Sequence, residues 1–219
     1  MNFKILSSYI NVESYLSNFL KVSKKNIHNI RMHSHHDTNT IIINGQSADL
    51  QSKLNKGDNL EINIELGTSN YIANNSLSII KEYEDDYLLI ASKPFGIKTH
   101  PNDITDENNT LVNYLITDYP YLEPIHRLDT DTCGLVIFAK TPFVKSKLDQ
   151  MLEHRVIKRF YTALVKNNIH VQTINTNIGR DNREKNKMAV TNKGKNAITN
   201  ILSCEKIVQN RFATTISLE

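Results

Sequence analysis

The apolar positions of the first segment recur at helical spacing and share one helical face: Tyr15, Leu16, Phe19 and Leu20. Ser23 can accept a hydrogen bond from a backbone N–H and so cap a second helical turn, which carries Ile27 and Ile30. The pattern therefore predicts two short helical stretches at the start of the chain.

The pattern then changes from helices to strands. Residues 33–37 (His-Ser-His-His-Asp) are polar and predict a loop, and residues 40–43 (Thr-Ile-Ile-Ile) predict a strand. Asn44-Gly45 is typical of a tight turn, and residues 60–64 alternate strictly between apolar and polar, which predicts a half-buried strand. Residues 67–76 are polar and rich in asparagine and serine, so we expect a linker there.

The remainder of the chain predicts mostly strands. Residues 136–139 (Val-Ile-Phe-Ala) form an apolar run typical of a buried strand. Gly134 before them can take backbone angles that other residues rarely adopt, or it can allow a close approach that a side chain would block. Thr141-Pro142 can start a helix, with the threonine as cap and the proline in the first turn. Together these elements predict an α+β fold built on a largely antiparallel sheet.

A cluster of charged residues stands directly before this apolar run. Arg127 and Asp129 lie two residues apart, and on the same side of the chain if the backbone is extended, so the cation favours the ionised carboxylate. A positioned, ionised carboxylate is a plausible nucleophile. A surface ion pair at the end of a strand is the alternative, and spacing alone leaves both open.

The order of these residues indicates a family. Residues 125–140 resemble the signature H-R-L-D-x-x-T-S-G-L of the RluA-type pseudouridine synthases, with Cys133 where that family usually has serine. Residues 86–101 resemble the family's strand, K-P-x-G turn and following H-P, and residues 158–165 resemble its K-x-Y-x-A-x-V strand. The resemblance extends from about residue 80 to the end of the sequence.

The resemblance implies an enzyme that isomerises uridine to pseudouridine in ribosomal or transfer RNA. Asp129 would be the catalytic residue that attacks the target nucleotide, and Arg127 would help to open the RNA helix and orient the aspartate. Tyr161 would lie against the uracil ring and assist the late proton transfer, since an aromatic face can hold an extruded base. Without the family, a packed strand residue is the favoured explanation of Tyr161. No cofactor or metal is implied, because the isomerisation is redox-neutral and transfers no phosphate.

We predict three parts: residues 1–66 as a small α/β RNA-binding module, 67–76 as a linker, and 77–219 as the catalytic domain. Residues 10–66 resemble the RNA-binding module named after ribosomal small-subunit protein four, and a docking domain without RNA contact is the alternative. In the family, a T-G-R-x-H-Q-I-R segment follows the strand that matches residues 212–219. The sequence stops at Glu219, so we expect a catalytic domain that is incomplete at its C-terminus, with weak or no synthase activity by itself.

Composition agrees with an RNA partner. The 219 residues carry a formal net charge of +3, and residues 180–195 hold an excess of basic side chains. Such a run can contact phosphates, and a solvated loop is its commoner meaning. Two cysteines cannot form a disulfide framework for this length, and no stretch of eighteen or more apolar residues exists. We therefore expect a cytoplasmic monomer that binds RNA and no membrane.

The sequence also suggests three alternatives. Asp129 and Asp131 are spaced like the paired aspartates of haloacid-dehalogenase-type phosphatases, but His126-Arg127 stand where that class has a buried strand. The three histidines of residues 33–37 lack the separated spacing of structural zinc sites, so no metal is expected. A non-catalytic RNA-binding protein derived from a pseudouridine synthase stays open as the alternative function.

Overall fold

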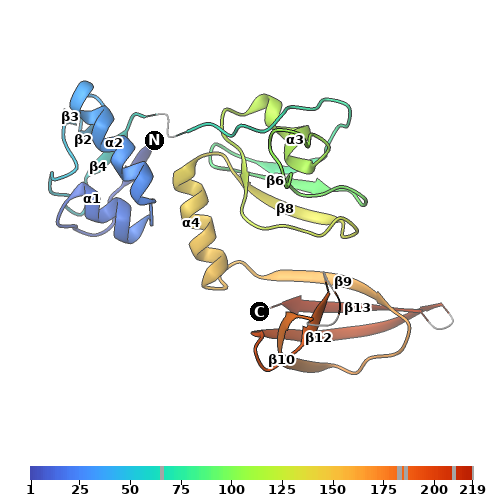
Figure 1. Cartoon of the computed structure of the whole chain (residues 1–219). Coiled ribbons are helices and arrows are strands. Elements are labelled where there is room, and N and C mark those ends of the chain that lie inside the picture. The colour runs from blue at the N-terminus through green and yellow to red at the C-terminus, as the bar shows by residue number, and fades with distance from the viewer. Residues whose placement is uncertain (65–66, 182–183, 185–186, 209–210, 219) are drawn as a thin grey trace. The chain divides into compact units, whose positions relative to one another are not determined.

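The computed structural model describes residues 1–64, 67–181, 184, 187–208 and 211–218. It divides into two compact units, Met1–Gln150 and Met151–Glu219 (Figure 1). Every pairing between the strands named below is antiparallel, and helices stand beside the sheets, so the predicted α+β fold is confirmed. No helix within the described ranges combines the length and the apolar character that crossing a bilayer requires.

The N-terminal part of the first unit packs helices on a small sheet of order β1-β4-β2-β3. Its strands are β1 (Asn2–Lys4), β2 (Ile41–Ile43), β3 (Gln46–Ser47) and β4 (Asn59–Ile62). Its helices are α1 (Val12–Ser14), the π-helix η1 (Tyr15–Phe19) and α2 (Lys24–His36). Leu16 and Ile30 are fully buried among the strand residues Ile41 and Leu60, which explains the helical spacing of the apolar positions.

Two local signals in this part are confirmed and one is wrong. The Ser23 side chain accepts a hydrogen bond from the Asn26 backbone N–H, as a helix cap does. Asn44 and Gly45 both have positive φ, of 52° and 79°, as the predicted tight turn requires. The loop predicted at residues 33–37 is instead the last turn of α2. The histidines there are exposed, and a helix continues along a polar stretch when those residues face water.

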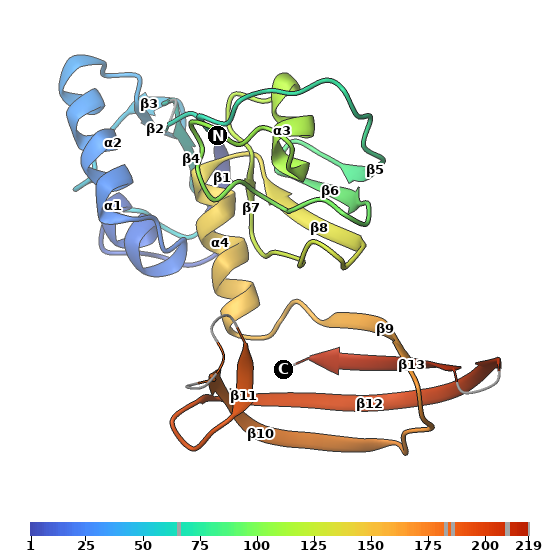
Figure 2. The same ribbon diagram turned by 45° about the vertical axis from the view of Figure 1, so that its right-hand side comes forward.

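The second sheet of the first unit has the order β5-β6-β8-β7 (Figure 2). It consists of β5 (Lys81–Glu84), β6 (Leu88–Lys93), β7 (Glu123–Pro124) and β8 (Gly134–Ala139), with Lys93 opposite Gly134. α3 (Leu111–Leu115) and the 3₁₀-helix η2 (Ile116–Asp118) connect β6 to β7. Val136, Phe138 and Ala139 are fully buried, so the predicted strand at residues 136–139 is confirmed.

The segment predicted as a linker contains no helix or strand, yet it is attached to its surroundings. Ser69 N–H donates to the Pro120 carbonyl at 3.0 Å, and the Asn113 side-chain amide donates to the Ile72 carbonyl at 2.8 Å. The Tyr71 hydroxyl donates to a Glu123 carboxylate oxygen at 2.7 Å. Residues 69–75 are therefore held against the elements that follow, and the division into three parts stays a prediction.

α4 (Pro142–Glu153) follows β8 and begins where the sequence predicts. The Val144 N–H donates to Thr141 Oγ1 at 3.3 Å, which is the expected cap. Phe143 and Leu148 are its buried residues.

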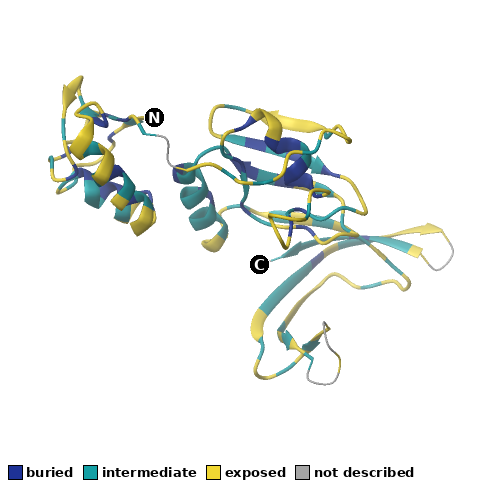
Figure 3. Cartoon of the chain, turned by 45° about the horizontal axis from the view of Figure 1, so that its top comes forward, coloured by how far each residue is buried: buried dark blue, intermediate teal, exposed yellow. Residues whose placement is uncertain are grey.

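The second unit contains one sheet of order β11-β10-β12-β13-β9. Its strands are β9 (Arg159–Val165), β10 (Gln172–Arg180), β11 (Met188–Val190), β12 (Lys195–Val208) and β13 (Arg211–Leu218). Most of its residues are exposed or half-buried, with Ile201 and Thr214 as the buried ones (Figure 3). Of the basic run at residues 180–195, Arg183 and Lys185 lie outside the described residues.

Candidate functional site

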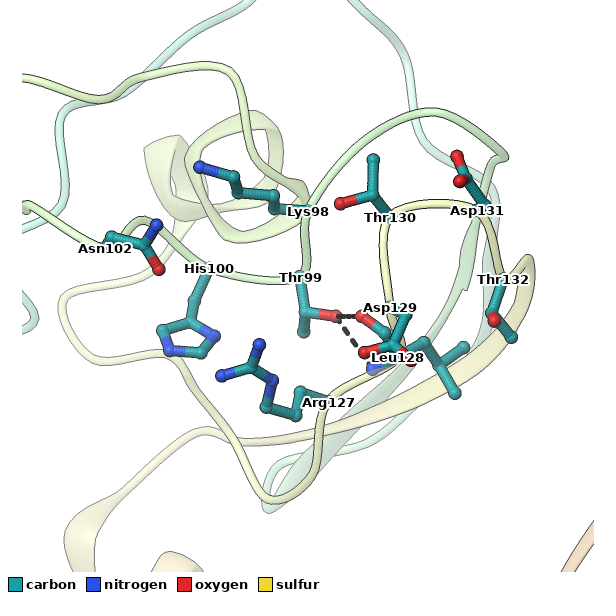
Figure 4. Close-up of a pocket in the computed structure, with 10 residues that line it drawn as sticks. All are labelled: Lys98, Thr99, His100, Asn102, Arg127, Leu128, Asp129, Thr130, Asp131 and Thr132. Carbon is teal, nitrogen blue, oxygen red and sulfur yellow. Dashed lines mark hydrogen bonds between the residues drawn. The ribbon is translucent and has the colours of Figure 1, made fainter. Parts of the chain in front are cut away.

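A cavity of about 490 Å³ lies in the first unit. One of its walls is the segment that follows β6, and the other is the segment that precedes β8. That volume is in the range of pockets that hold small molecules or single nucleotides. Ten residues from two loops line it (Figure 4): Lys98, Thr99, His100, Asn102, Arg127, Leu128, Asp129, Thr130, Asp131 and Thr132.

The structure places the predicted residues Arg127 and Asp129 together on the wall of this cavity. Both are exposed, while Leu128 between them is buried with 6% of its surface accessible. This alternation puts both charged side chains on the side of the chain that faces the cavity. In the described part of the molecule no ion pair joins Arg127 to Asp129, so the carboxylate is not held by a direct salt bridge.

The backbone immediately before Asp129 is fixed by a buried threonine. Thr99 Oγ1 donates to the Leu128 carbonyl at 2.9 Å and accepts from the Leu128 N–H at 3.0 Å (Figure 4). One hydroxyl therefore satisfies both backbone groups of a buried residue, which would otherwise lack partners. Leu128 cannot rotate without breaking both bonds.

The backbone immediately after Asp129 is fixed by a buried lysine. Lys93 is 1% exposed, and its ammonium group donates to the carbonyls of Ile97 at 2.6 Å, Pro94 at 3.1 Å and Thr130 at 3.1 Å. The Gly96 N–H also donates to the Thr130 carbonyl, at 2.9 Å. Burial lowers the pKa of Lys93 below its ordinary value, while the nearby acidic groups of Cys133, Asp131 and Asp129 act in the opposite direction.

This role of Lys93 was not predicted from the sequence. The sequence indicates Lys93 only as the first residue of the K-P-x-G turn. The available signal was its position as the last residue of the alternating strand Leu88–Lys93, where the pattern points it to the buried side. A lysine at a buried position needs hydrogen-bond acceptors, and the following turn supplies them.

Gly134 ends the loop with a backbone conformation that explains its residue type. Its φ is +130°, a region that residues with side chains rarely adopt, so the first of the two expectations for this glycine is confirmed. A Cβ atom there would lie 3.9 Å from Leu128 Cδ1, an ordinary contact. Space is therefore not what requires glycine.

One side of the cavity is basic. His100 and the Arg127 guanidinium face each other there (Figure 4), and burial, followed by the charge of Arg127, lowers the pKa of His100. Lys98 forms an ion pair with Glu107 at 2.5 Å, and the Glu107 carboxylate also accepts the Asn102 N–H at 2.8 Å. These two bonds lower the pKa of Glu107. They also connect Lys98 and Asn102, at the beginning of this cavity loop, to Glu107 at its end.

The third predicted residue belongs to the other unit. Tyr161 lies on β9, half-buried, on the same face of the strand as Ala163 and Val165, and it is paired with Ile216 of β13. The first unit therefore brings together Arg127 and Asp129 but does not contain Tyr161. Among the described residues, no three His, Cys, Asp or Glu side chains gather as metal ligands would.

Comparison with known families identifies the fold around this cavity. The model of the RNA pseudouridylate synthase family matches residues 87–218, which include the cavity loops and β9. The chain belongs to the RNA pseudouridylate synthase family. The RluA-type resemblance inferred from the sequence is thus confirmed. The model of the RluD ribosomal pseudouridine synthase N-terminal domain matches residues 1–60, which confirms an N-terminal module. Its likeness to the module of ribosomal protein four stays a prediction.

Individual members of the RNA pseudouridylate synthase family show the same relationship. The uncharacterized RNA pseudouridine synthase YhcT of Bacillus subtilis is 33% identical over 85% of this chain and 62% of its own length. Ribosomal large subunit pseudouridine synthase D of Xanthomonas campestris is 31% identical over 81% of this chain and 54% of its own length. The chain therefore spans about 54–62% of these relatives.

A solved structure shows the same fold. Human RNA Pseudouridylate Synthase Domain Containing 1 superposes with a TM-score of 0.51 and 21% sequence identity. The superposition covers 66% of this chain and 59% of the human chain.

Proposed function

We propose that this chain isomerises specific uridines of ribosomal or transfer RNA to pseudouridine, with Asp129 as the nucleophile. The proposal is supported most directly by the position of Asp129, whose side chain is exposed on the wall of a cavity large enough for a nucleotide. Its backbone neighbours, Leu128 and Thr130, are each held by a hydrogen bond from a buried side chain, Thr99 and Lys93 respectively. A nucleophile anchored on both sides approaches its target in one fixed geometry.

The proposed reaction breaks one bond and forms another within the same nucleotide. The Asp129 carboxylate attacks the target nucleotide and the bond between C1′ of the ribose and N1 of uracil breaks. Uracil rotates, C5 bonds to C1′ as the bond between Asp129 and the nucleotide breaks and frees the carboxylate, the proton on C5 leaves to solvent, and N1 gains a proton. The product has the same composition as the substrate, so no electron or group carrier takes part.

Arg127 and Tyr161 have supporting roles in this proposal. Arg127 lines the cavity and has no carboxylate partner in the described part of the chain, so its guanidinium is available to RNA phosphates or to an extruded base. Tyr161 would place its ring against the uracil and assist the late proton transfer. The RNA partner and the two free thiols, Cys133 and Cys204, fit the reducing cytoplasm as the place of action.

The test compares Asp129→Asn with Asp131→Asn, because both aspartates line the same cavity on the same loop. RNA labelled with tritium at C5 of uridine is incubated with excess protein, and tritium released to water is measured. We expect Asp129→Asn to lose on the order of 10³-fold or more in rate, Asp131→Asn to lose less than about tenfold, and both to bind RNA equally. Turnover by Asp129→Asn close to that of the unmodified chain would contradict the proposal.

The Bacillus subtilis relative is measured in the same assay as a reference for the rate. Binding of RNA without tritium release, unchanged by Asp129→Asn, would establish the alternative of a non-catalytic RNA-binding protein.

A further inference from the structure

His100 lies in the segment that follows β6, and the backbone on both sides of it is fixed. Its neighbours Thr99 and Pro101 are buried, and the Val112 N–H donates to the Thr99 carbonyl at 3.1 Å. A proline also restricts the residue before it to an extended backbone. The imidazole is therefore presented in one direction, and it lines the same cavity as Asp129.

The side chain of His100 makes no hydrogen bond within the part of the chain that the structure describes, although it is half-buried. It faces the guanidinium of Arg127 in the cavity (Figure 4). No ion pair among the described residues includes Arg127. Imidazole and guanidinium both donate N–H groups, and guanidinium is well suited to phosphate oxygens. Two such groups that face each other can hold one anion between them.

Four charged groups surround His100, and their balance is positive. Glu107 is neutralised by its ion pair with Lys98, and the Glu123 carboxylate accepts hydrogen bonds from a serine and a tyrosine hydroxyl. Burial and the charge of Arg127 lower the pKa of His100 more than the two carboxylates raise it. The imidazole is therefore mostly neutral at about pH 7. A bound anion would favour its protonated form.

The cavity has room for a nucleotide and separates two kinds of group on its wall. The Asp129 carboxylate is the group that meets the ribose in the proposed function, and His100 and Arg127 form the basic side. In a nucleotide the ribose is bonded both to the base and to the phosphates. A carboxylate that meets the ribose therefore has a phosphate close by, and the basic side offers that phosphate its donors.

We propose that His100 and Arg127 together hold a phosphate of the RNA strand beside the target nucleotide, and that His100 takes up a proton when this phosphate binds. The proton comes from solvent and returns to it when the RNA leaves, so no bond of the RNA changes in this step. The inference rests on the proposed function, because it places the ribose of the same strand at Asp129.

The first experiment follows the imidazole signals of the full chain by NMR as the pH is varied, and His100→Gln assigns the signal. Oligouridine should raise the pKa of His100 by about one pH unit, whereas uridine, which has no phosphate, should leave it unchanged. Inorganic phosphate at the same concentration should raise it less. No rise with oligouridine, or an equal rise with uridine, would overturn the inference. An equal rise with inorganic phosphate would overturn the assignment to an RNA strand.

The second experiment measures the affinity for oligouridine by fluorescence anisotropy at about pH 6 and about pH 8, on either side of the ordinary histidine pKa. The unmodified chain should bind several-fold more tightly at the lower pH, up to about tenfold for a change of one pH unit in pKa. His100→Gln should lose this gain. His100→Arg keeps a cation at both pH values, so it should bind tightly at both, which separates a lost charge from a folding defect.

The control His170→Gln removes an exposed imidazole outside the cavity and should keep the gain at low pH. A full gain in His100→Gln, or an equal loss in the control, would contradict the proposal. Both measurements can be repeated with Asp129→Asn, which should retain the rise in the His100 pKa. A failure of the phosphate site is thus distinguishable from a failure of the proposed function, which the tritium assay tests.

Discussion

The ammonium group of Lys93 donates to the carbonyl of Thr130 at 3.1 Å, although 37 residues separate the two in the chain. Lys93 is the last residue of β6, and Thr130 directly follows Asp129. The bond therefore attaches the candidate nucleophile's loop to the end of a buried strand. The Thr99 hydroxyl holds Leu128 on the other side, so the backbone on both sides of Asp129 is fixed by a hydrogen bond from a buried side chain.

Replacing Lys93 by methionine should destabilise the protein by about 3 kcal/mol, because three carbonyls lose the buried ammonium group as donor, although that of Thr130 keeps the Gly96 N–H. The rate of tritium release should fall with it, since the Asp129 loop is freed. Chemical denaturation measures the first effect. Lys53→Met, at an exposed position, is the control and should change stability by less than about 0.5 kcal/mol. Equal stabilities of the two variants would refute the proposed anchoring.

Thr99→Val keeps the shape of the side chain but removes the hydroxyl that serves both backbone groups of Leu128. We expect a loss of about 2 kcal/mol in the free energy of unfolding and a lower kcat with little change in KM, because the nucleophile is misplaced rather than the RNA released. Thr99→Ser keeps the hydroxyl and should retain most of the kcat. A valine variant as active as the serine variant would contradict this account.

Gly134→Ala should cost about 1–3 kcal/mol of stability through backbone strain alone. The φ of +130° is unfavourable for alanine, whereas the new Cβ would meet only an ordinary contact with Leu128. Leu135→Ala, at the next and 57% exposed position, provides the comparison and should cost less. Thermal unfolding of both variants measures the difference, and an equal or smaller loss for Gly134→Ala would argue against a strain requirement.

His100 should make stability depend on pH. Burial and the charge of Arg127 lower its pKa in the folded protein, so the unfolded chain binds the proton more readily. The free energy of unfolding should therefore decrease as the pH falls below about 6.5, the ordinary histidine value, until it passes the pKa of the folded state. Arg127→Gln should raise the His100 pKa, which an NMR titration detects. An unchanged pKa in that variant would contradict the proximity of the two groups.

The elements that the sequence predicts well depend on neighbouring residues. The caps at Ser23 and Thr141 and the Asn44-Gly45 turn each involve backbone groups within a few residues, so the local pattern contains the necessary information. The end of α2 was missed because the exposed histidines interrupt the apolar spacing. Helix continuation there depends on solvent exposure, which spacing alone does not reveal.

The candidate site was predicted only in part, because some of its contacts join residues that are far apart in the sequence. The order of residues 125–140 indicated Asp129 and Arg127 through a family resemblance, and both line the cavity. The bonds of Lys93 to Thr130 and of Thr99 to Leu128 join residues 37 and 29 positions apart. Contacts at such separations follow from the pairing of β6 with β8 and are not encoded in any local motif.

The strand order of the second unit also bears on how the molecule is made. β13 is inserted between β12 and β9, so β9, with Tyr161, has no neighbour in the described sheet until residues 211–218 are in place. During synthesis on the ribosome, β9 emerges about 50 residues earlier than its partner, at translation rates of roughly 5–20 residues per second. The strand that carries Tyr161 is therefore unpaired for several seconds after it is synthesised. We expect chaperones to bind it mainly in that interval, because an unpaired strand exposes free backbone groups.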